Sequence, residues 1–325
     1  MAMNYSFQGV YKELLTGYVE EKYALGLKFT AQVRRLKQFD QLSFSFSCLT
    51  VDNLSRDIVD AFVYEPGITE NTSRIRSCNI RNFAEYMLAH GKDAYVFPPR
   101  QFRAPPPYLP YIFTKEQIIR LFTELDSKAS QFSRIRSRMD SAVIIRMLYG
   151  CGLRISEALN LRIQDVDLEQ GILFIRSSKF DKDRTVPMSA SLHKICQRYA
   201  QSFLGGWPAE AFFFSPDGKR KYSSQTIYGR FRNALFDAGI PHRGKGLGPR
   251  LHDLRHTFAV HSLQQMVKQG FDLYTELPIL STYLGHASVS ATQGYLRLTT
   301  EMFPEVLTAV ENMFGDVYPE VLPNE

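Results

Sequence analysis

Cysteine is scarce in this chain: its 325 residues include four, and no two of them form a CxxC pair. Widely separated thiols without that spacing argue against a zinc site and against a disulfide-bonded scaffold. We therefore expect these cysteines to be buried thiols of a protein in the reducing cytoplasm. They are Cys48, Cys78, Cys151 and Cys196.

Long apolar runs and internal repeats are also absent. No stretch approaches the run of about 18 apolar residues that marks a membrane-spanning helix, so we expect no contact with a membrane. The N-terminus lacks a basic segment followed by an apolar one, so secretion is not expected. With 44% hydrophobic and 22% charged residues, the composition is that of a soluble globular protein, and the length predicts two domains.

Charge is distributed unevenly along the chain. The net charge is +6, yet residues 1–97 are neutral overall, whereas residues 108–300 carry 26 basic and 16 acidic residues. Because lysine and arginine bind phosphates and release counterions, this basic region favours a nucleic acid as the partner. Residues 301–325 contain six acids and no base, and DNA would repel such a segment. The acidic tail therefore needs a different role.

A proline-rich segment divides the chain. Residues 98–110 contain six of the 16 prolines, and proline interrupts both helices and central strands. We interpret this segment as a semi-rigid linker that carries Arg100 and Arg103, two further basic residues for DNA. It separates a first domain, residues 1–107, from a second domain, residues 108–325.

The apolar spacing before the linker is helical. It predicts helices over 8–25, 55–64 and 71–90. On the third of these, Arg74 and Arg81 lie seven residues apart and share a face, which could follow a phosphate backbone or simply be solvated. A separate stripe of the same helix is expected to be buried: Ile75, Cys78, Phe83 and Met87.

Helices also dominate after the linker, with one predicted hairpin. Residues 140–149 are apolar nearly all round, which predicts a central buried helix that ends at the glycines beginning with Gly150. Residues 172–176 and 184–188 predict two short strands, and the polar segment between them predicts a turn.

A glycine-rich basic loop follows at residues 242–250. Its three glycines and one proline cannot pack a core, so we expect it at the surface. Its basic residues would contact the phosphate backbone of DNA there. They are Arg243, Lys245 and Arg250.

Four fragments contain residues suited to chemistry on a phosphate. They are GLRISEAL (152–159), the hairpin residue Lys179, HDLRHTFAVH (252–261) and LGHASVSATQGY (284–295). His252 and Arg255 are three residues apart on a predicted helix, so both project from one face. A guanidinium offers a planar fork of donors to an oxyanion and repels a cation. For that reason a metal site built from His252, His256 and His286 is the weaker alternative, and we expect no metal.

The order of these fragments resembles the tyrosine recombinase (phage integrase) family. GLRISEAL resembles the first-arginine box, SSKFDKDRTVP the β-hairpin with its catalytic lysine, HDLRHTFA the H-x-x-R box, and LGHASVSATQGY the final His…Tyr box. The resemblance covers about residues 108–315, and the N-terminal part is similar only in kind. It implies a mainly α fold with a small β-hairpin or sheet, in two domains: a helical core-binding domain and a tyrosine-recombinase catalytic domain.

The resemblance also implies a role for each matching residue. Arg154 and Arg255 would hold the two non-bridging oxygens of the scissile phosphate, and His286 would donate a further hydrogen bond. Tyr295 would be the nucleophile and become linked to the 3′-phosphate. The bond energy is retained in that link, so a 5′-hydroxyl can reverse the step, and no metal, ATP or other cofactor is required.

The remaining roles concern proton transfer and support. His252 would be the general base for Tyr295, and Lys179 would protonate the departing 5′-oxygen. Glu157 would support Arg154 as a neighbouring carboxylate. Tyr283 competes with Tyr295 as the nucleophile, but its apolar surroundings favour core packing.

Two segments depart from or extend the family pattern. The stretch between Arg255 and Leu284 is somewhat longer than usual, and a turn near 268–278 would absorb the extra residues. Residues 304–314 predict a tail helix with one apolar stripe. That helix could pack on its own domain or dock into a groove of a neighbouring protomer.

The predicted function is a site-specific DNA recombinase that cuts and rejoins double-stranded DNA, with four protomers acting together. Two alternatives stay open: a type IB-like topoisomerase with the same chemistry, and a DNA-binding regulator without catalysis. The sequence does not decide among an integrase of a mobile element, a transposase and a resolvase of chromosome dimers.

Overall fold

The computed structural model describes residues 6–47, 49–99, 101–103, 108–129, 135–176, 183–242, 244, 248–286 and 295. Within these residues the chain is mainly helical with two small sheets, which confirms the predicted fold class. It divides into two compact units, Met1–Tyr108 and Leu109–Glu325. No helix in the described part of the chain is long and apolar enough to cross a membrane.

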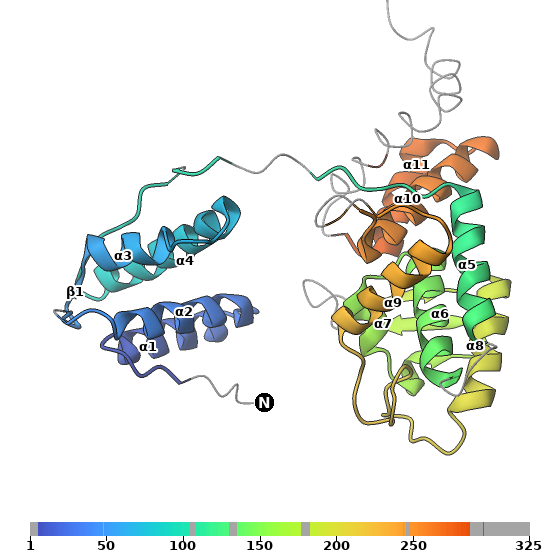
Figure 1. The fold of residues 1–325 in the computed structure, drawn as a ribbon, viewed down its shortest axis with the longest axis horizontal. Helices are drawn as coiled ribbons and strands as arrows, with labels where there is room; N and C mark the ends of the chain where they lie inside the picture. The colour runs from blue at the N-terminus through green and yellow to red at the C-terminus, as the bar shows by residue number, and fades with distance from the viewer. Residues whose placement is uncertain are drawn as a thin grey trace, which may run out of the picture. The chain divides into compact units, whose positions relative to one another are not determined.

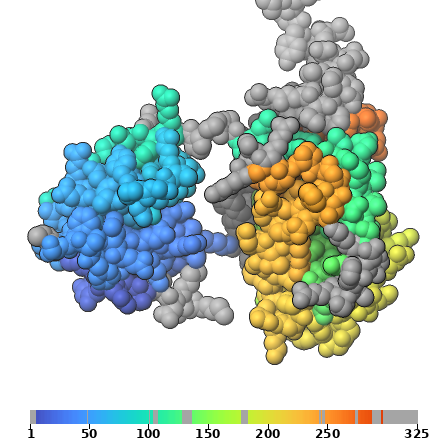
Figure 2. All heavy atoms as spheres, in the orientation of Figure 1, coloured from blue at the N-terminus to red at the C-terminus, as the bar shows by residue number. Residues whose placement is uncertain are grey.

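The described residues of the first unit form four helices and one pair of short strands. In Figure 1, α1 and α2 lie together, as do α3 and α4, and helix contacts also join α1 and α2 to α4. The space-filling view shows one continuous surface over these helices (Figure 2). The core beneath is aromatic, with Tyr11, Phe39 and Phe83 in mutual ring contact. The elements are α1 (Lys12–Ala24), α2 (Thr30–Ser43), β1 (Asn53–Leu54), α3 (Arg56–Val63), α4 (Glu70–Ala89) and β2 (Asp93–Ala94), with β1 parallel to β2.

The buried face of α4 differs from the predicted stripe. Cys78 is exposed, so the expectation of a buried thiol is wrong there, whereas Phe83 and Met87 are buried as predicted. The N-terminal half of the helix instead buries Arg76, whose guanidinium donates to the Phe62 carbonyl and pairs with the Glu65 carboxylate. Arg76, rather than Cys78, therefore lies on the buried face of α4 that contacts α3, and its guanidinium is paired there.

A single buried helix organises the second unit. Helix α6 (Ile135–Gly150) contacts α5 (Lys115–Ala129), α8 (Ala190–Phe203), α9 (Ser224–Asp237) and α10 (Leu251–Lys268), and these surround it in Figure 1. Its residues from Asp140 to Leu148 are all buried, as the apolar pattern predicts. The one acid among them, Asp140, accepts hydrogen bonds from the hydroxyls of Tyr199 and Tyr222. The buried carboxylate of Asp140 therefore has hydrogen-bond partners in the core. These bonds connect α6 to α8 and to the segment before α9.

The predicted hairpin is part of a three-stranded antiparallel sheet. Strands β4 (Ile172–Ile175) and β5 (Arg184–Pro187) pair with Ile175 opposite Arg184, and β3 (Val166–Asp167) adds a third strand at the other edge of β4. A 3-10 turn, η1 (Ile163–Asp165), leads into β3. Lys179 belongs to the segment between β4 and β5 that lies outside the described residues.

Two further helices belong to the described part of this unit. Helix α10 is followed by a turn over residues 269–272 and then by α11 (Leu273–Leu284), so the extra residues form a turn inside the stretch that the spacing predicts. A small apolar core joins these helices and includes Leu263, Leu280, Leu284 and Tyr295. The short helix α7 (Ile155–Asn160) follows α6 after Gly152.

Replacing Gly152 with alanine should destabilise the second unit. Gly152 has a φ of +59°, and an added Cβ would lie 2.6 Å from Phe258 Cδ1 and 2.7 Å from Leu284 Cδ2. We expect a loss of about 1–2 kcal/mol from the left-handed backbone and about 1–3 kcal/mol from overpacking. The matched control is Gly206→Ala, which has a φ of +77° but no atom within 4 Å of the added Cβ. Equal losses for the two variants in urea unfolding would contradict the packing constraint.

Candidate active site

Arg154 is held by the helix that it begins. It is the residue before α7, where its backbone N–H donates to Glu157 Oε2 at 2.9 Å and its Nη1 donates to Glu157 Oε1 at 2.7 Å. A carboxylate three residues inside a helix satisfies a backbone donor that the helix leaves open. Arg154 Nη2 also donates to the Gly285 carbonyl at 3.1 Å. The first and last sequence boxes therefore meet at this side chain.

Glu157 is shared by a second arginine that the sequence analysis did not single out. Arg184 donates from Nη1 and Nη2 to the two carboxylate oxygens at 3.0 and 2.8 Å, and from Nε to the Tyr283 carbonyl at 2.9 Å. An added Cβ at Gly285, which has a φ of +68°, would lie 2.9 Å from Arg184 Nη1. Only glycine therefore lets the guanidinium lie against this loop.

Three guanidinium groups surround this one carboxylate. Arg255 Nη1 lies 4.0 Å from Glu157 Oε2. Burial raises the pKa of Glu157, but the hydrogen bonds and charges of Arg184 and Arg154 outweigh it and lower the pKa to about 2. Glu157 is thus ionised at neutral pH and offsets part of the positive charge of the cluster.

Arg255 lies deepest in the cluster. It is 1% exposed, and its Nη1 and Nη2 donate to the carbonyls of Gly152 and Leu284, each at 2.7 Å. Burial and then the charge of Arg154 lower its pKa to about 10, so it remains protonated at neutral pH. Because main-chain carbonyls fix both ends of the guanidinium, its orientation is set before any ligand arrives.

Three histidines line the same cluster, and all are neutral at pH 7. Desolvation and then the charges of Arg255 and Arg154 lower the pKa of His286 to about 4. The same causes lower the pKa of His252 to about 4, although this residue at the start of α10 is exposed. For His256, burial, His252 and Arg255 lower the pKa to about 3. Each ring therefore has one lone-pair nitrogen and one N–H.

Tyr295 comes to this cluster from the last sequence box. It is 5% exposed, and its hydroxyl lies 2.9 Å from His256 Nδ1. Its ring stacks with His286 at 5.9 Å between centroids and 22° between planes. Burial raises the pKa of Tyr295, and the charges of Arg255 and Arg154 act against that rise. The phenol is therefore protonated at neutral pH.

The sequence analysis did not predict the positions of Arg184 and His256 in this cluster, although the sequence contains a signal for each. Arg184 and Val186 alternate on strand β5 and share a face, and Val186 is fully buried, so an arginine in that register points inward and needs an acid. His256 lies one helical turn after His252, and the sequence analysis weighed it only as a metal ligand. Its four-residue spacing also brings it over the same face, toward the residues of the last box.

The other predicted residues lie in varied surroundings. Lys179, Arg100, Arg243 and Lys245 lie outside the described residues. Arg74, Arg103 and Arg250 are exposed, and Arg81 donates to the carbonyls of Phe97 and Pro98, so it holds the start of the linker against α4. Their contacts with DNA stay predictions.

The Tyr283 hydroxyl donates to the Pro187 carbonyl at 3.0 Å, and its ring stacks on Phe258, a packing role as expected.

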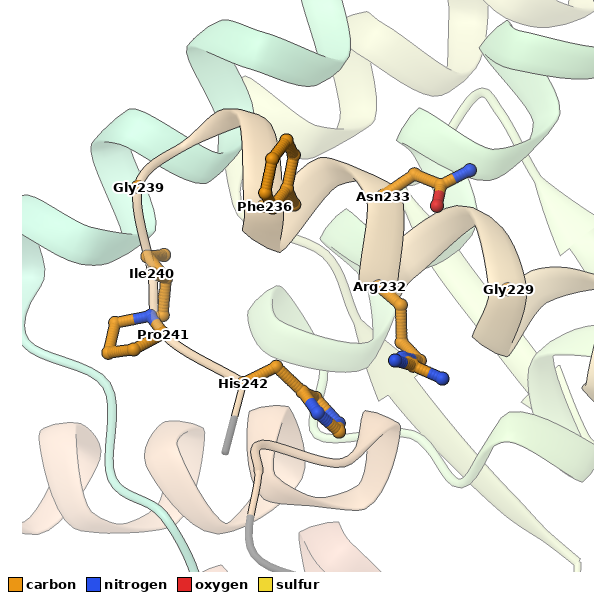
Figure 3. Close-up of a pocket in the computed structure, with 8 residues that line it drawn as sticks. All are labelled: Gly229, Arg232, Asn233, Phe236, Gly239, Ile240, Pro241 and His242. Atoms are coloured by element: carbon orange, nitrogen blue, oxygen red, sulfur yellow. The ribbon is translucent and has the colours of Figure 1, made fainter. Parts of the chain in front are cut away.

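A separate hollow lies at α9 and the loop after it. It is a cavity of about 620 Å³ lined by eight residues of that segment. Figure 3 shows Arg232 of α9 and His242 of the loop extending toward the same side of it. Phe236 of the same helix is 83% exposed. None of the lining residues belongs to the cluster around Tyr295, and the hollow presents basic and aromatic side chains beside the predicted phosphate-binding loop.

In the described part of the chain, no group of three or more His, Cys, Asp or Glu side chains could hold a metal ion. The three histidines instead lie among two guanidinium groups. A cation would be repelled there, whereas an anion would meet donors from every side.

Comparison with known proteins decides the family. The sequence model of the phage integrase family matches residues 112–302, more than half of the chain. The chain belongs to the phage integrase family. This family of tyrosine recombinases carries out site-specific recombination, so the chain is a DNA-binding enzyme that recombines DNA at specific sites.

Individual relatives of this integrase-family chain match it over nearly its whole length. The integrase/recombinase y4rE of Sinorhizobium fredii is 32% identical over 313 residues, which cover 94% of this chain and 96% of that protein. The tyrosine recombinase XerA of Pyrococcus furiosus is 28% identical and covers 94% and 89%. The structure of a lambda integrase dimer bound to a COC′ core site shares the fold, with a TM-score of 0.61, 14% identity, and coverage of 87% and 76%.

Arg184→Gln should weaken the second unit in a pH-dependent way. Glu157 has a folded pKa of about 2 against an ordinary value of 4.5, so its ionic contacts stabilise the fold above pH 4.5 and are lost as the pH falls to about 2. Without Arg184, burial raises that pKa. The deficit of the variant, on the order of 2–4 kcal/mol at pH 7, should then shrink between pH 4.5 and pH 3.

The matched control for this prediction is Arg146→Gln. Arg146 is similarly buried and donates to Asp126 at 2.7 Å, but that carboxylate is exposed to solvent. Its deficit should be smaller and vary less with pH, because solvent screens the pair. Urea unfolding of both variants from pH 7 to pH 3 checks this, and parallel profiles would contradict the role of Arg184 at Glu157.

Proposed function

We propose that the cluster around Tyr295 is the strand-transfer site of this recombinase, with Tyr295 as its nucleophile. The observation that carries this is the position of the buried Tyr295 hydroxyl. It lies 2.9 Å from His256 Nδ1 and within the electrostatic influence of Arg255 and Arg154, two of the guanidinium groups whose ion pairs, in the described part of the chain, all go to Glu157. Such a group favours one more negative charge, and a DNA phosphodiester supplies one.

Arg154 and Arg255 then bind the two non-bridging oxygens of the scissile phosphate. Each guanidinium carries five N–H donors, so the contacts that hold it in place leave capacity for a phosphate oxygen. Their orientation is preset by Glu157, Gly152 and Leu284, so little reorganisation is needed as negative charge develops on the phosphate. His286 adds a donor from its N–H.

Strand transfer is a transesterification. The Tyr295 oxygen attacks phosphorus, the bond from phosphorus to the 5′-oxygen breaks, and a 3′-phosphotyrosine forms. Lys179 supplies a proton to the departing 5′-oxygen, a role that rests on the match of its segment to the family hairpin. The 5′-hydroxyl of a second strand reverses the step and completes the exchange.

Tyr295→Phe should abolish the covalent adduct with DNA while leaving DNA binding nearly unchanged, since only the hydroxyl is lost. The matched control is Tyr283→Phe, which also removes a tyrosine hydroxyl, one that donates to the Pro187 carbonyl. A nicked substrate that traps the adduct, followed on a denaturing gel, makes the comparison. Adduct formation by Tyr295→Phe, or loss of the adduct only in Tyr283→Phe, would overturn the assignment.

We further propose that four protomers act together on two DNA duplexes, and that the N-terminal unit also binds the duplex. The basic residues Arg74, Arg103 and Arg250 are exposed, so phosphates can reach them. The tail helix expected over residues 304–314 lies outside the described residues, and its apolar stripe is the proposed link between protomers.

Deleting residues 303–325 should leave binding to a single site intact but weaken cooperative filling of paired sites. The apolar side chains that would bury against a neighbour are lost, whereas the basic surface for DNA stays. Deleting only residues 316–325 is the control, because it removes acids of the tail and keeps the stripe. Gel-shift titrations on one-site and two-site DNA separate the two, and unchanged cooperativity in the longer deletion would exclude the tail as the link.

A further inference from the structure

Three consecutive main-chain carbonyls at the end of α11 accept hydrogen bonds from three different arginines. In the order of residues 283–285, the donors are Arg184, Arg255 and Arg154, at 2.9, 2.7 and 3.1 Å. The same three guanidinium groups surround the Glu157 carboxylate. One short segment therefore holds all three arginines in place. Arg154 and Arg255 already have roles at the phosphate, whereas Arg184 has none.

We propose that Arg184 is a positioning residue for strand transfer. It holds Glu157 in the orientation that leaves Arg154 free to bind the scissile phosphate, and it does not itself contact DNA. The proposal rests on the proposed function of the cluster around Tyr295. No bond forms or breaks at Arg184 and no proton moves there, because its effect reaches the phosphate through the Glu157 carboxylate.

The two arginines share the Glu157 carboxylate evenly. Oε1 accepts from Arg184 Nη1 at 3.0 Å and from Arg154 Nη1 at 2.7 Å. Oε2 accepts from Arg184 Nη2 at 2.8 Å and from the Arg154 backbone N–H at 2.9 Å. Because the fork of Arg184 occupies both oxygens, Glu157 is kept from rotating into a bidentate pair with the side chain of Arg154. Arg154 therefore keeps donors for a phosphate oxygen.

The balance of charge has the same effect. With Arg184 present, three guanidinium groups lie around one carboxylate. Without it, two would remain, and Glu157 would neutralise a larger share of the positive charge that a phosphodiester meets. Arg184 thus favours the negative charge that develops on the phosphate while lying behind the residues that bind it.

The contacts of Arg184 fix its own position. All three nitrogens of its guanidinium group donate to protein acceptors, and its side chain is 8% exposed. The Tyr283 hydroxyl donates back to the Pro187 carbonyl, so β5 and the end of α11 are joined at two points. An added Cβ at Gly285 would lie 3.0 Å from Arg184 Cζ, so the backbone packs closely against the guanidinium. Arg184 is therefore placed to act on Glu157 rather than on substrate.

Single-turnover cleavage of a nicked substrate by the full chain tests the proposal. The amplitude reports the folded fraction, and the rate constant reports the chemistry, so a purely structural role would change only the amplitude. Arg184→Gln should lower the rate constant by up to about 10²-fold, the cost of misplacing a catalytic group by about 1 Å, with DNA affinity nearly unchanged. Arg184→Lys should recover only part of that loss, because an ammonium lacks the planar fork.

Arg146→Gln is the matched control. Arg146 is a similarly buried arginine that pairs with Asp126, outside the cluster around Glu157. Its substitution should leave the rate constant unchanged. A normal rate constant in Arg184→Gln, full recovery in Arg184→Lys, or an equal loss in Arg146→Gln would overturn the proposal.

A double variant tests whether Arg184 acts through Glu157. Glu157→Gln combined with Arg184→Gln leaves no buried carboxylate without its arginine, so it also guards against a single variant that fails to fold. Residues that act through one another have non-additive effects, so the double variant should cleave no more slowly than Glu157→Gln alone. Losses that multiply would overturn the proposal. If Tyr295→Phe still forms the adduct, the proposed function itself has failed, which is a different result.

Discussion

A single buried carboxylate organises the site of this recombinase. Glu157 joins Arg154, at the start of α7, to Arg184, at the start of β5, and lies near Arg255 of α10. Three guanidinium groups this close would repel one another in a buried setting. The negative charge of Glu157 reduces that repulsion. These ion pairs connect α7 to the sheet, and Arg154 also donates to Gly285 of the last sequence box. They meet where we expect the phosphate to bind.

Main-chain carbonyls complete what the carboxylate begins. The carbonyls of Gly152, Leu284 and Gly285 accept from Arg255 and Arg154. Leu284 is the last residue of α11, and Gly152 and Gly285 follow α6 and α11, so these carbonyls lie at helix ends, where acceptors lack partners in the helix. Gly285 also lets Arg184 approach closely. The site is therefore built from helix ends. The end of α6 is held in position because this central helix packs against the helices around it.

Desolvation sets the protonation states of the site. Burial and neighbouring guanidinium groups keep His256 and His286 neutral, whereas burial alone keeps Tyr295 protonated, against the charges of Arg255 and Arg154. The Tyr295 hydroxyl is therefore not ionised in the absence of a ligand. A negative charge placed beside these imidazoles would favour their protonated form.

Local pattern determined much of the fold in advance. The all-round apolar run of 140–149 required a central helix, the two β-rich runs required a hairpin, and the prolines of 98–110 excluded regular structure there. The order of the four boxes was enough to indicate the family and to select Arg154, Arg255, His286 and Tyr295. These features depend on residue type and on spacing along the chain, which a sequence displays directly.

Partners distant in sequence were decided only by tertiary structure. The inward register of Arg184 on β5, its pairing with Glu157, and the orientation of α4 around Arg76 depend on which elements pack together. The choice between His252 and His256 as the neighbour of Tyr295 is of the same kind. Both histidines fit one helical face, and a turn of α10 separates them, so only the three-dimensional position of Tyr295 distinguishes a histidine that contacts the hydroxyl from one that does not.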